Sequence, residues 1–353
     1  MATLINYLKN AVAINASDVF LVAGGPVCAK RDGKIAPMDD SRLLPPESEA
    51  LISELYRLAG RTTAHYMDTG DDDFSFAIPG LARFRVNAYR QRGSLAAVIR
   101  VVAFDIPDYR KLGIPEQVMQ LANIAHGMVL ITGTAGSGKS TTQACIIDRI
   151  NATRDAHVIT LEDPIEYLHR NKKSIISQRE IAIDTVDYLS ALRACLRQAP
   201  DVILLGEMRD FETIRTAITA AETGHLLIAT LHTQGAVSSI DRVIDSFPPT
   251  QQGQVRIQLS MVLSAIVSQQ LLPDTAGGLT PAYEIMHMNG AIRNMIRDCK
   301  NYQIDNVLQT SGAEGMVSMD QSILTLWQAG KITAETAEEY AVNPEQLRRK
   351  LIQ

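Results

Sequence analysis

A glycine-rich stretch that follows an apolar run constrains the fold of this chain more than any other feature. The stretch Gly133-Thr-Ala-Gly-Ser-Gly-Lys139-Ser140 fits the pattern G-x-x-x-x-G-K-[ST], in which backbone N–H groups surround the phosphates of a nucleotide. Residues 128–132 have the composition of a buried strand, and residues 141–150 have helical spacing. Strand, loop and helix in this order form a phosphate-binding P-loop, so the sequence predicts a nucleotide-binding domain.

Each part of this loop has an expected role toward a nucleotide. Lys139 reaches the β- and γ-phosphates, Ser140 holds Mg²⁺, and the positive end of the following helix attracts the phosphate charge. The predicted ligands are therefore a nucleotide and Mg²⁺. The residues expected to contact the nucleotide are Gly133, Thr134, Ala135, Gly136, Ser137, Gly138, Lys139, Ser140 and Thr141.

Composition excludes several classes of protein. A length of 353 residues suggests two or three domains, and the net charge of −5 gives no sign of a surface for nucleic acid or for an anionic membrane. The four cysteines form no C-x-x-C pair, which argues against zinc and implies no disulfide. Neither a signal peptide nor an apolar run of the ~18 residues that span a membrane is present, so we expect a cytoplasmic protein.

The residue pattern changes along the chain and predicts two domains of an α/β protein. Residues 1–104 have the pattern of a small α+β domain. Residues 105–115 contain two prolines and a glycine, which favours a linker. In residues 116–353 strands alternate with helices, as in a parallel sheet covered on both faces, and helices dominate the C-terminal part.

Periodicity places the individual elements. Asp71-Asp72-Asp73 is interpreted as a solvated acidic loop rather than a metal site. The predicted helices cover residues 4–13, 48–58, 141–150, 185–197, 211–222, 236–246, 251–270, 291–298, 320–329 and 333–340. The predicted strands cover residues 18–22, 74–78, 82–89, 94–102, 128–132, 157–161, 202–205 and 226–231.

Two carboxylates follow predicted strands, at the sheet edge where open parallel sheets bind ligands. Glu207 is the first carboxylate after the apolar strand 202–205, which is the Walker B pattern, and is the candidate general base for the attacking water. Glu162 follows strand 157–161 and can orient this water or bind Mg²⁺. Ser140, Glu162 and Glu207 are thus the candidate metal ligands. The alternative for this second stretch is a helix cap at Asp163.

Two histidines frame the next predicted strand. His225 precedes residues 226–231 and His232 follows them, within a glycine and threonine context. A histidine at a strand end can sense or hold a γ-phosphate, whereas a lone histidine is more often structural. The sequence leaves both interpretations open, and we predict nucleotide binding for His225 and a catalytic contribution for His232.

These motifs resemble, in order and spacing, those of the secretion ATPase superfamily. The P-loop, the stretch 160–167, the stretch 204–210 and the stretch 223–233 resemble its Walker A, Asp box, Walker B and His box. The run Ala220-Ala-Glu-Thr-Gly-His225 and the motif Ala291-Ile-Arg-Asn-Met-Ile296 resemble the type IV pilus retraction ATPases, the PilT group. The resemblance is strongest over residues 80–300 and weak in the first 80 residues.

The resemblance implies an architecture and a set of partners. It implies a PAS-like N-terminal domain, a linker and a RecA-like ATPase domain, assembled into homohexameric rings that hydrolyse ATP with Mg²⁺ and drive pilus retraction. Such a motor would act in the cytoplasm at the inner face of the cell membrane, on an inner-membrane pilus platform protein, with neither nucleic acid nor zinc.

The same resemblance implies roles for particular arginines. Arg85 and Arg100 match N-domain arginines that approach the phosphates, and Arg193 and Arg197 match a second pair on the ATPase domain. A developing negative charge on the γ-phosphoryl oxygens favours such mobile guanidinium groups. Arg293 matches a motif on which retraction depends, and helical spacing leaves it apart from the inward-facing Ile292, Met295 and Ile296.

The sequence departs from the family pattern at two positions, and other functions fit it less well. Phe20 stands where the family usually has histidine, and Ala199 replaces an acidic residue. Pilus extension and type II secretion ATPases usually carry an extra N-terminal domain and a tetracysteine zinc insertion, which this sequence lacks. A RecA-type DNA motor would favour a basic, aromatic-lined channel, and 5 % aromatic residues do not support one. A non-hydrolysing scaffold ranks low because Glu207 and both histidines are present.

Overall fold

The computed structural model describes residues 3–31, 33–102 and 106–351. The chain divides into two compact units, one made of Met1–Asp105 with Glu166–Leu168 and the other of Ile106–Ile165 with His169–Gln353. Ile106, Tyr109, Leu112 and Ile114, from the predicted linker, pack against the apolar core of the second unit. The domain boundaries derived from the sequence remain a prediction.

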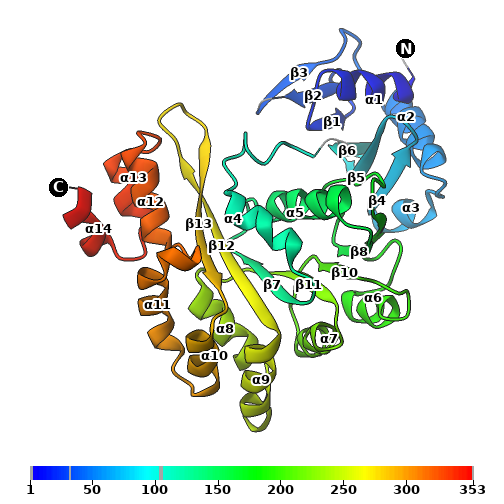
Figure 1. Ribbon diagram of the computed structural model, residues 1–353. Helices are drawn as coiled ribbons and strands as arrows, with labels where there is room; N and C mark the ends of the chain where they lie inside the picture. Colours follow the sequence, from blue (N-terminus) through cyan, green and yellow to red (C-terminus); the bar gives the residue numbers. More distant parts are fainter. Residues whose placement is uncertain (1–2, 32, 103–105, 352–353) are drawn as a thin grey trace. The chain divides into compact units, whose positions relative to one another are not determined.

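The first unit is a six-stranded antiparallel sheet with three helices. Its strand order is β3-β2-β1-β6-β5-β4, and every neighbouring pair is antiparallel. The long strands alternate buried and exposed side chains, so one sheet face forms the core with α1 and α2. The elements are α1 (Leu4–Ala13), β1 (Asp18–Leu21), β2 (Cys28–Arg31), β3 (Lys34–Pro37), α2 (Pro45–Leu58), α3 (Ala64–Thr69), β4 (Asp71–Ile78), β5 (Ala82–Gln91) and β6 (Ser94–Val102) (Figure 1).

The three aspartates at 71–73 do not form the predicted solvated loop. They begin β4, and Asp72 is buried. The hydroxyl of Tyr56 donates to the Asp72 carboxylate at 2.9 Å, and Arg61 pairs with it at 3.3 Å. A carboxylate such as that of Asp72 can be buried because it has two partners. These partners lie 11 and 16 residues away along the chain, so the local acidic run does not predict them.

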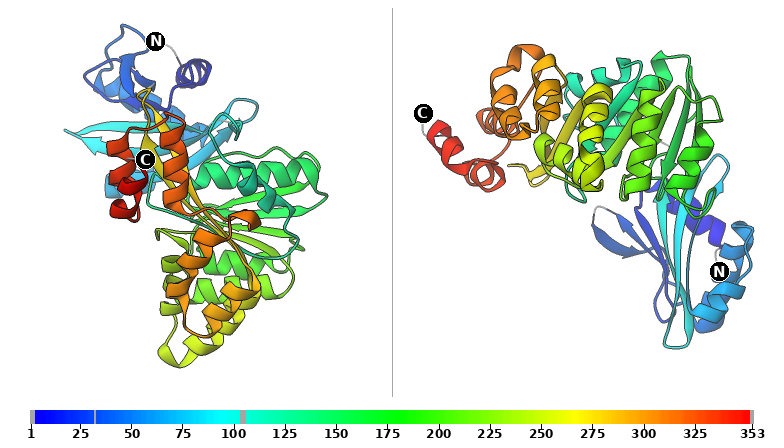
Figure 2. Two further views of the ribbon diagram at one scale, coloured as in Figure 1. Left: turned by 60° about the vertical axis from the view of Figure 1, so that its left-hand side comes forward. Right: turned by 90° about the horizontal axis from the view of Figure 1, so that it is seen from below.

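The second unit is built on a seven-stranded sheet of order β13-β12-β7-β11-β10-β8-β9. Six strands are parallel and β13 runs antiparallel to β12. The central strands are buried throughout, because helices cover both faces of the sheet (Figures 1 and 2). The strands are β7 (Gly127–Thr132), β8 (His157–Glu162), β9 (Ile175–Glu180), β10 (Val202–Leu205), β11 (Leu226–Leu231), β12 (Leu263–Pro273) and β13 (Leu279–His287).

Alternate side chains of the central strands pack against the two helical layers. Met128 and Leu130 face α6 to α11, whereas Val129 and Ile131 face α4 and α5. Helices α12 to α14 form a smaller cluster with the end of β12 and with β13. The helices are α4 (Glu116–Met119), α5 (Lys139–Thr153), α6 (Tyr188–Cys195), α7 (Phe211–Glu222), α8 (Ala236–Asp245), α9 (Pro249–Val262), α10 (Gly290–Arg297), α11 (Ile304–Thr310), α12 (Met319–Gln328), α13 (Ala334–Tyr340) and α14 (Pro344–Leu351).

The predicted helix over 251–270 is wrong in its second half. Helix α9 ends at Val262, and residues 263–273 form β12 between β7 and β13. Most of this strand is buried on both sides, and for such a run hydrophobic periodicity does not separate a strand from a helix. Helix α6 is also shorter than the predicted 185–197, because Asp187 caps it by accepting from the Ser190 N–H at 2.7 Å.

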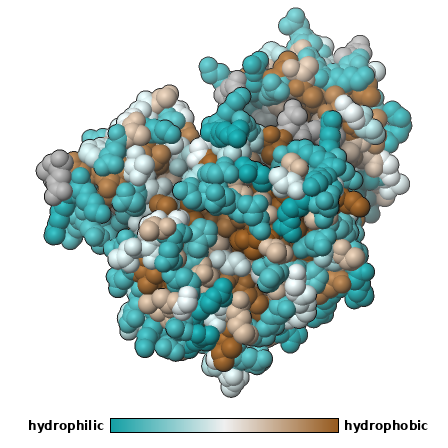
Figure 3. Space-filling model, viewed as in Figure 1, coloured by the Kyte–Doolittle hydropathy of each residue, from teal (hydrophilic) through white to brown (hydrophobic). Residues whose placement is uncertain are grey.

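The face of the molecule seen in Figure 3 mixes polar and apolar side chains. In the view of Figure 3, apolar side chains lie in small groups among polar ones. No helix within the described ranges is long and apolar enough to cross a membrane.

Candidate nucleotide site

The P-loop joins the end of β7 to the start of α5, as the sequence predicts. Gly133 has φ +140° and Gly138 has φ +87°, backbone conformations that L side chains rarely adopt. A Cβ on Gly138 would lie 2.7 Å from the Gln269 side-chain nitrogen, and one on Gly133 would collide with the Gln269 carbonyl oxygen. Close packing against the β12 backbone therefore requires glycine at 133, and the positive φ favours glycine at 138.

The ammonium of Lys139 lies inside the loop. Lys139 is only 8 % exposed, and its Nζ donates to the carbonyl oxygens of Gly133 at 2.8 Å and Thr134 at 2.7 Å. The hydroxyls of Thr132 and Ser137 are buried and have no hydrogen-bond partner among the described residues. Since an unsatisfied buried hydroxyl is costly, these donors fit a site whose partner is a bound phosphate.

A small apolar pocket lies beside the loop. It has a volume of about 260 Å³ and combines Gly138 and Thr141 of the loop and first helical turn with side chains from 111–114, β12 and β13. Its size and its apolar walls suit the base of a nucleotide whose phosphates lie in the loop. Sequence reasoning missed this wall, because residues 111–114 were assigned to a linker and β12 to a helix. The apolar lining is Leu112, Ile114, Leu271, Leu279, Pro281 and Tyr283.

Glu207 lies at the carboxyl end of β10, two strands from the P-loop strand. It is 9 % exposed, and its Oε2 lies 3.3 Å from His232 Nε2. The other carboxylate oxygen pairs with the guanidinium of Arg209, and this partner raises the pKa of Arg209. A buried carboxylate beside the phosphate site, with an imidazole at hydrogen-bond distance, can orient and deprotonate a water molecule.

Glu162 ends β8, the next strand outward. Its carboxylate accepts from Thr160 Oγ1 at 2.6 Å and from Gln178 Nε2 at 3.1 Å. The register pairs Leu205 with Leu161, so Glu162 and Glu207 lie at the same edge of the sheet. This edge also carries Ser140 at the start of α5, so the three predicted Mg²⁺ ligands share one side of the domain.

His225 does not lie at this edge of the sheet, and its contact with the nucleotide remains a prediction. It precedes β11, and β11 pairs Leu226 with Gly127, the first residue of β7. Six strand residues at ~3.3 Å each place it about 20 Å from the P-loop edge. Its Nδ1 lies 2.9 Å from the Ala220 carbonyl oxygen at the end of α7, so the histidine closes that helix terminus.

The two arginines of the second unit that were predicted to act on the nucleotide, Arg193 and Arg197, contact groups on α6 and α7. Arg193 on α6 pairs with Glu212 on α7 at 3.2 Å, and Arg197 donates to the Arg193 carbonyl at 3.2 Å. The action of both on a nucleotide remains a prediction.

Arg85 and Arg100 lie together in the first unit. They are direct partners in the register of β5 and β6 and line a hollow of about 320 Å³ with Asp18, Asp73 and Asn87. Arg100 pairs with Asp18 at 3.0 Å and is otherwise largely exposed. The hollow thus contains two guanidinium groups and two carboxylates, and the action of Arg85 and Arg100 on a nucleotide remains a prediction.

Arg293 is not a solvated helix charge. Its guanidinium donates to the carbonyl oxygens of Ser260 and, at 3.0 Å, Met261, in the last turn of α9. Ile292 and Ile296 of the same helix are buried, as predicted. Arg293 therefore holds the junction between α9 and β12.

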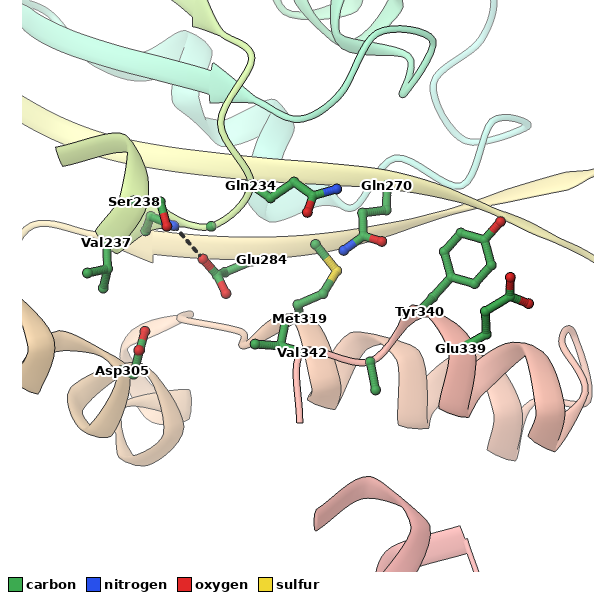
Figure 4. Close-up of a pocket in the computed structure, with 13 residues that line it drawn as sticks. Gln234, Val237, Ser238, Gln270, Glu284, Asp305, Met319, Glu339, Tyr340 and Val342 are labelled. Atoms are coloured by element: carbon green, nitrogen blue, oxygen red, sulfur yellow. Dashed lines mark hydrogen bonds between the residues drawn. The ribbon is translucent and has the colours of Figure 1, made fainter. Parts of the chain in front are cut away.

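A larger cavity of about 570 Å³ lies on the other side of β12 and β13 (Figure 4). Its lining includes Glu284, Asp305 and Glu339, and burial raises the pKa values of Glu284 and Asp305. The Glu284 carboxylate accepts from the Ala236 N–H at 2.7 Å and thus caps α8. This cavity is separate from the P-loop pocket.

Known proteins are similar to this chain in sequence and in fold. A family model described as type II/IV secretion system protein matches residues 2–337. The chain is 42 % identical over 330 residues to the "Type IV pilus retractation ATPase PilT" of Pseudomonas aeruginosa, covering 94 % of this chain and 95 % of that protein. It is 47 % identical over 283 residues to a twitching motility protein of Neisseria gonorrhoeae, covering 80 % and 76 %.

A solved structure of the pilus retraction motor PilT with bound ADP superposes with a TM-score of 0.90 and 44 % identity, covering 99 % of this chain and 100 % of that one. The predicted α/β class and the predicted resemblance are both confirmed. The chain therefore belongs to the type II/IV secretion system protein family, and its relatives in that family include pilus retraction ATPases.

Proposed function

We propose that this chain is a motor ATPase that hydrolyses ATP and uses the energy to retract type IV pili. The observation that carries the proposal is the P-loop, with its buried ammonium and unsatisfied hydroxyls, beside the Glu207 carboxylate at the same sheet edge. The similarity to a retraction ATPase over 94 % of this chain supports the same conclusion.

The residues present suit each requirement of the reaction. On binding, Lys139 exchanges its carbonyl partners in the loop for phosphate oxygens, and the loop N–H groups surround the phosphates. Ser140, Glu162 and Glu207 would hold Mg²⁺, which neutralises charge on the phosphates. Glu207 orients the attacking water and accepts its proton, while His232 holds the Glu207 carboxylate.

The working assembly belongs to the proposal. We expect a homohexameric ring in the cytoplasm, at the inner face of the membrane that carries a pilus platform protein. In such a ring Arg85, Arg100, Arg193 and Arg197 act as mobile cations toward ATP, for which their exposed guanidinium groups are suited.

Two experiments test the function. Purified wild-type protein should bind ADP and release phosphate from ATP with Mg²⁺, and protein without turnover would contradict the enzyme assignment. A strain lacking the gene should carry long pili that do not retract. Absent pili would instead support an extension ATPase, and salt-sensitive DNA binding would support a DNA motor.

A further inference from the structure

Gln269 of β12 lies against two points of the P-loop and one point of the helix that follows it. It is 3 % exposed, and β12 pairs Ser268 with Thr132, so Gln269 stands beside the first loop glycine. Its main-chain carbonyl approaches Gly133 closely, and its side-chain nitrogen faces the backbone at Gly138. One residue of a neighbouring strand thus contacts both ends of the six-residue glycine-rich segment.

The third contact fixes the helix that follows the loop. Thr142 in the first turn of α5 is fully buried, and its Oγ1 donates to Gln269 Oε1 at 2.7 Å. Because Oε1 is taken as an acceptor, the amide nitrogen of the same side chain is directed toward Gly138 and the 260 Å³ pocket. The glutamine side chain therefore supplies an acceptor to the helix and a donor toward the loop.

The strand pair that carries Gln269 also holds the segment after His232. Ser268 Oγ accepts from the Gly235 N–H at 2.9 Å. Glu284, the register partner of Ser268 on β13, accepts from the Ala236 N–H, as the dashed line in Figure 4 shows. Adjacent residues of β12 therefore attach to the phosphate loop and to the segment that follows the catalytic histidine.

We infer that Gln269 is a positioning residue of the nucleotide site, which holds the P-loop and the first turn of α5 in the shape that accepts phosphate. The inference rests on the proposed ATPase function. Gln269 sets the geometry of the loop through Thr142 and Gly138 and is not itself a catalytic group.

The chemistry of glutamine gives the inference its test. Gln269→Met keeps the length of the side chain and removes both polar atoms. Gln269→Glu keeps the acceptor for Thr142, removes the donor and adds a negative charge near the phosphates. If Gln269 only supplies the acceptor for Thr142, the glutamate variant is the milder one. If it positions the phosphate loop, the glutamate variant is the more harmful one for nucleotide binding.

The experiment measures ADP affinity, ATP turnover and thermal unfolding without nucleotide in the full-length protein. We expect Gln269→Met to lower the affinity for ADP about three- to tenfold, because one or two ordinary hydrogen bonds are lost. Gln269→Glu should lower this affinity by more than tenfold. The double variant Thr142→Val, Gln269→Met should lower the affinity for ADP by less than the product of the fold losses in the two single variants, because both changes remove the same contact. Gln270→Met, on the next residue of the same strand, is the matched control and should bind ADP like wild type.

Two results would overturn the inference: unchanged ADP affinity in folded Gln269→Met and Gln269→Glu proteins, or a glutamate variant that binds ADP better than the methionine variant. If either variant fails to fold, the Thr142→Val protein tests the same contact through its ADP affinity. Wild-type protein that fails to bind ADP would instead contradict the proposed function, so the two failures are distinguishable.

Discussion

Glu207 Oε2 and His232 Nε2 lie 3.3 Å apart, although the two residues are separated by 25 positions in the chain. They follow β10 and β11, which are neighbours in the sheet with Leu205 paired to Ala229. The parallel arrangement thus brings the candidate base and a histidine to one edge, beside the P-loop strand β7.

The first prediction concerns Glu207. Glu207→Gln should retain ATP binding and lower turnover by about 10²–10⁴-fold, because loss of a general base typically has this effect. Nucleotide titration and a phosphate-release assay on the same preparation measure both quantities. Glu222→Gln, on the surface of α7, is the control and should be fully active. Turnover at the wild-type rate would move the assignment to Glu162.

The second prediction concerns Lys139. Lys139→Ala should weaken ADP and ATP binding about ten- to a hundredfold, because charge-assisted hydrogen bonds contribute ~1.5–3 kcal/mol each. Isothermal titration of nucleotide into the variant measures the loss, with the exposed Lys300→Ala as a control of equal charge change. Equal nucleotide affinity in both variants would show that Lys139 of the P-loop does not contribute to nucleotide binding.

The third prediction concerns the paired arginines of the first unit. Arg85→Ala and Arg100→Ala should leave ADP binding largely intact and lower turnover, by ~10³-fold if they act as arginine fingers do in related sites. Arg90→Ala, on the same strand as Arg85 and outside the 320 Å³ hollow, should turn over ATP normally. Full activity of one variant would remove that arginine from the reaction.

The fourth prediction separates hydrolysis from mechanical work. Arg293→Ala removes the group that holds the last carbonyls of α9, and such helix-end contacts contribute ~0.3–1 kcal/mol. We expect nearly normal ATP turnover and nearly normal thermal stability, with pilus retraction lost in cells. Arg297→Ala on the same helix is the control.

The outcomes for Arg293 are distinct. Normal retraction would make it a local helix cap with no role in motion. Loss of both turnover and retraction would indicate that the α9–β12 junction is needed for folding or assembly.

The P-loop and the Walker B strand were predictable because their signals are local. A run of apolar residues followed by glycines, lysine and serine constrains backbone and chemistry within about twenty positions. The same holds for Glu207, which is the first carboxylate after a short apolar strand. The predicted helix over 211–222 matches α7 residue for residue, since its buried positions recur at helical spacing and Asp210 caps it.

The positions of His225 and Asp72 in the fold could not be predicted from local sequence patterns. Both histidines of the stretch 223–233 look alike in sequence, but the six residues of β11 separate them by the length of that strand. His232 therefore lies 3.3 Å from Glu207, whereas His225 contacts the end of α7. Asp72 looks solvated in an acidic run, but Tyr56 and Arg61 reach it from elsewhere in the chain.

The sequence by itself determined the phosphate loop, the strands β7, β8, β10 and β11 with helix α7 around it, and the family of this protein. Only the tertiary structure decided that residues 263–273 form a strand beside the loop, and that Gln269 lies against Gly133, Gly138 and Thr142. The physical reason is the pairing of β12 with β7 across more than 130 residues of chain: a doubly buried apolar run satisfies a helix and a strand equally well until its neighbours supply the hydrogen bonds.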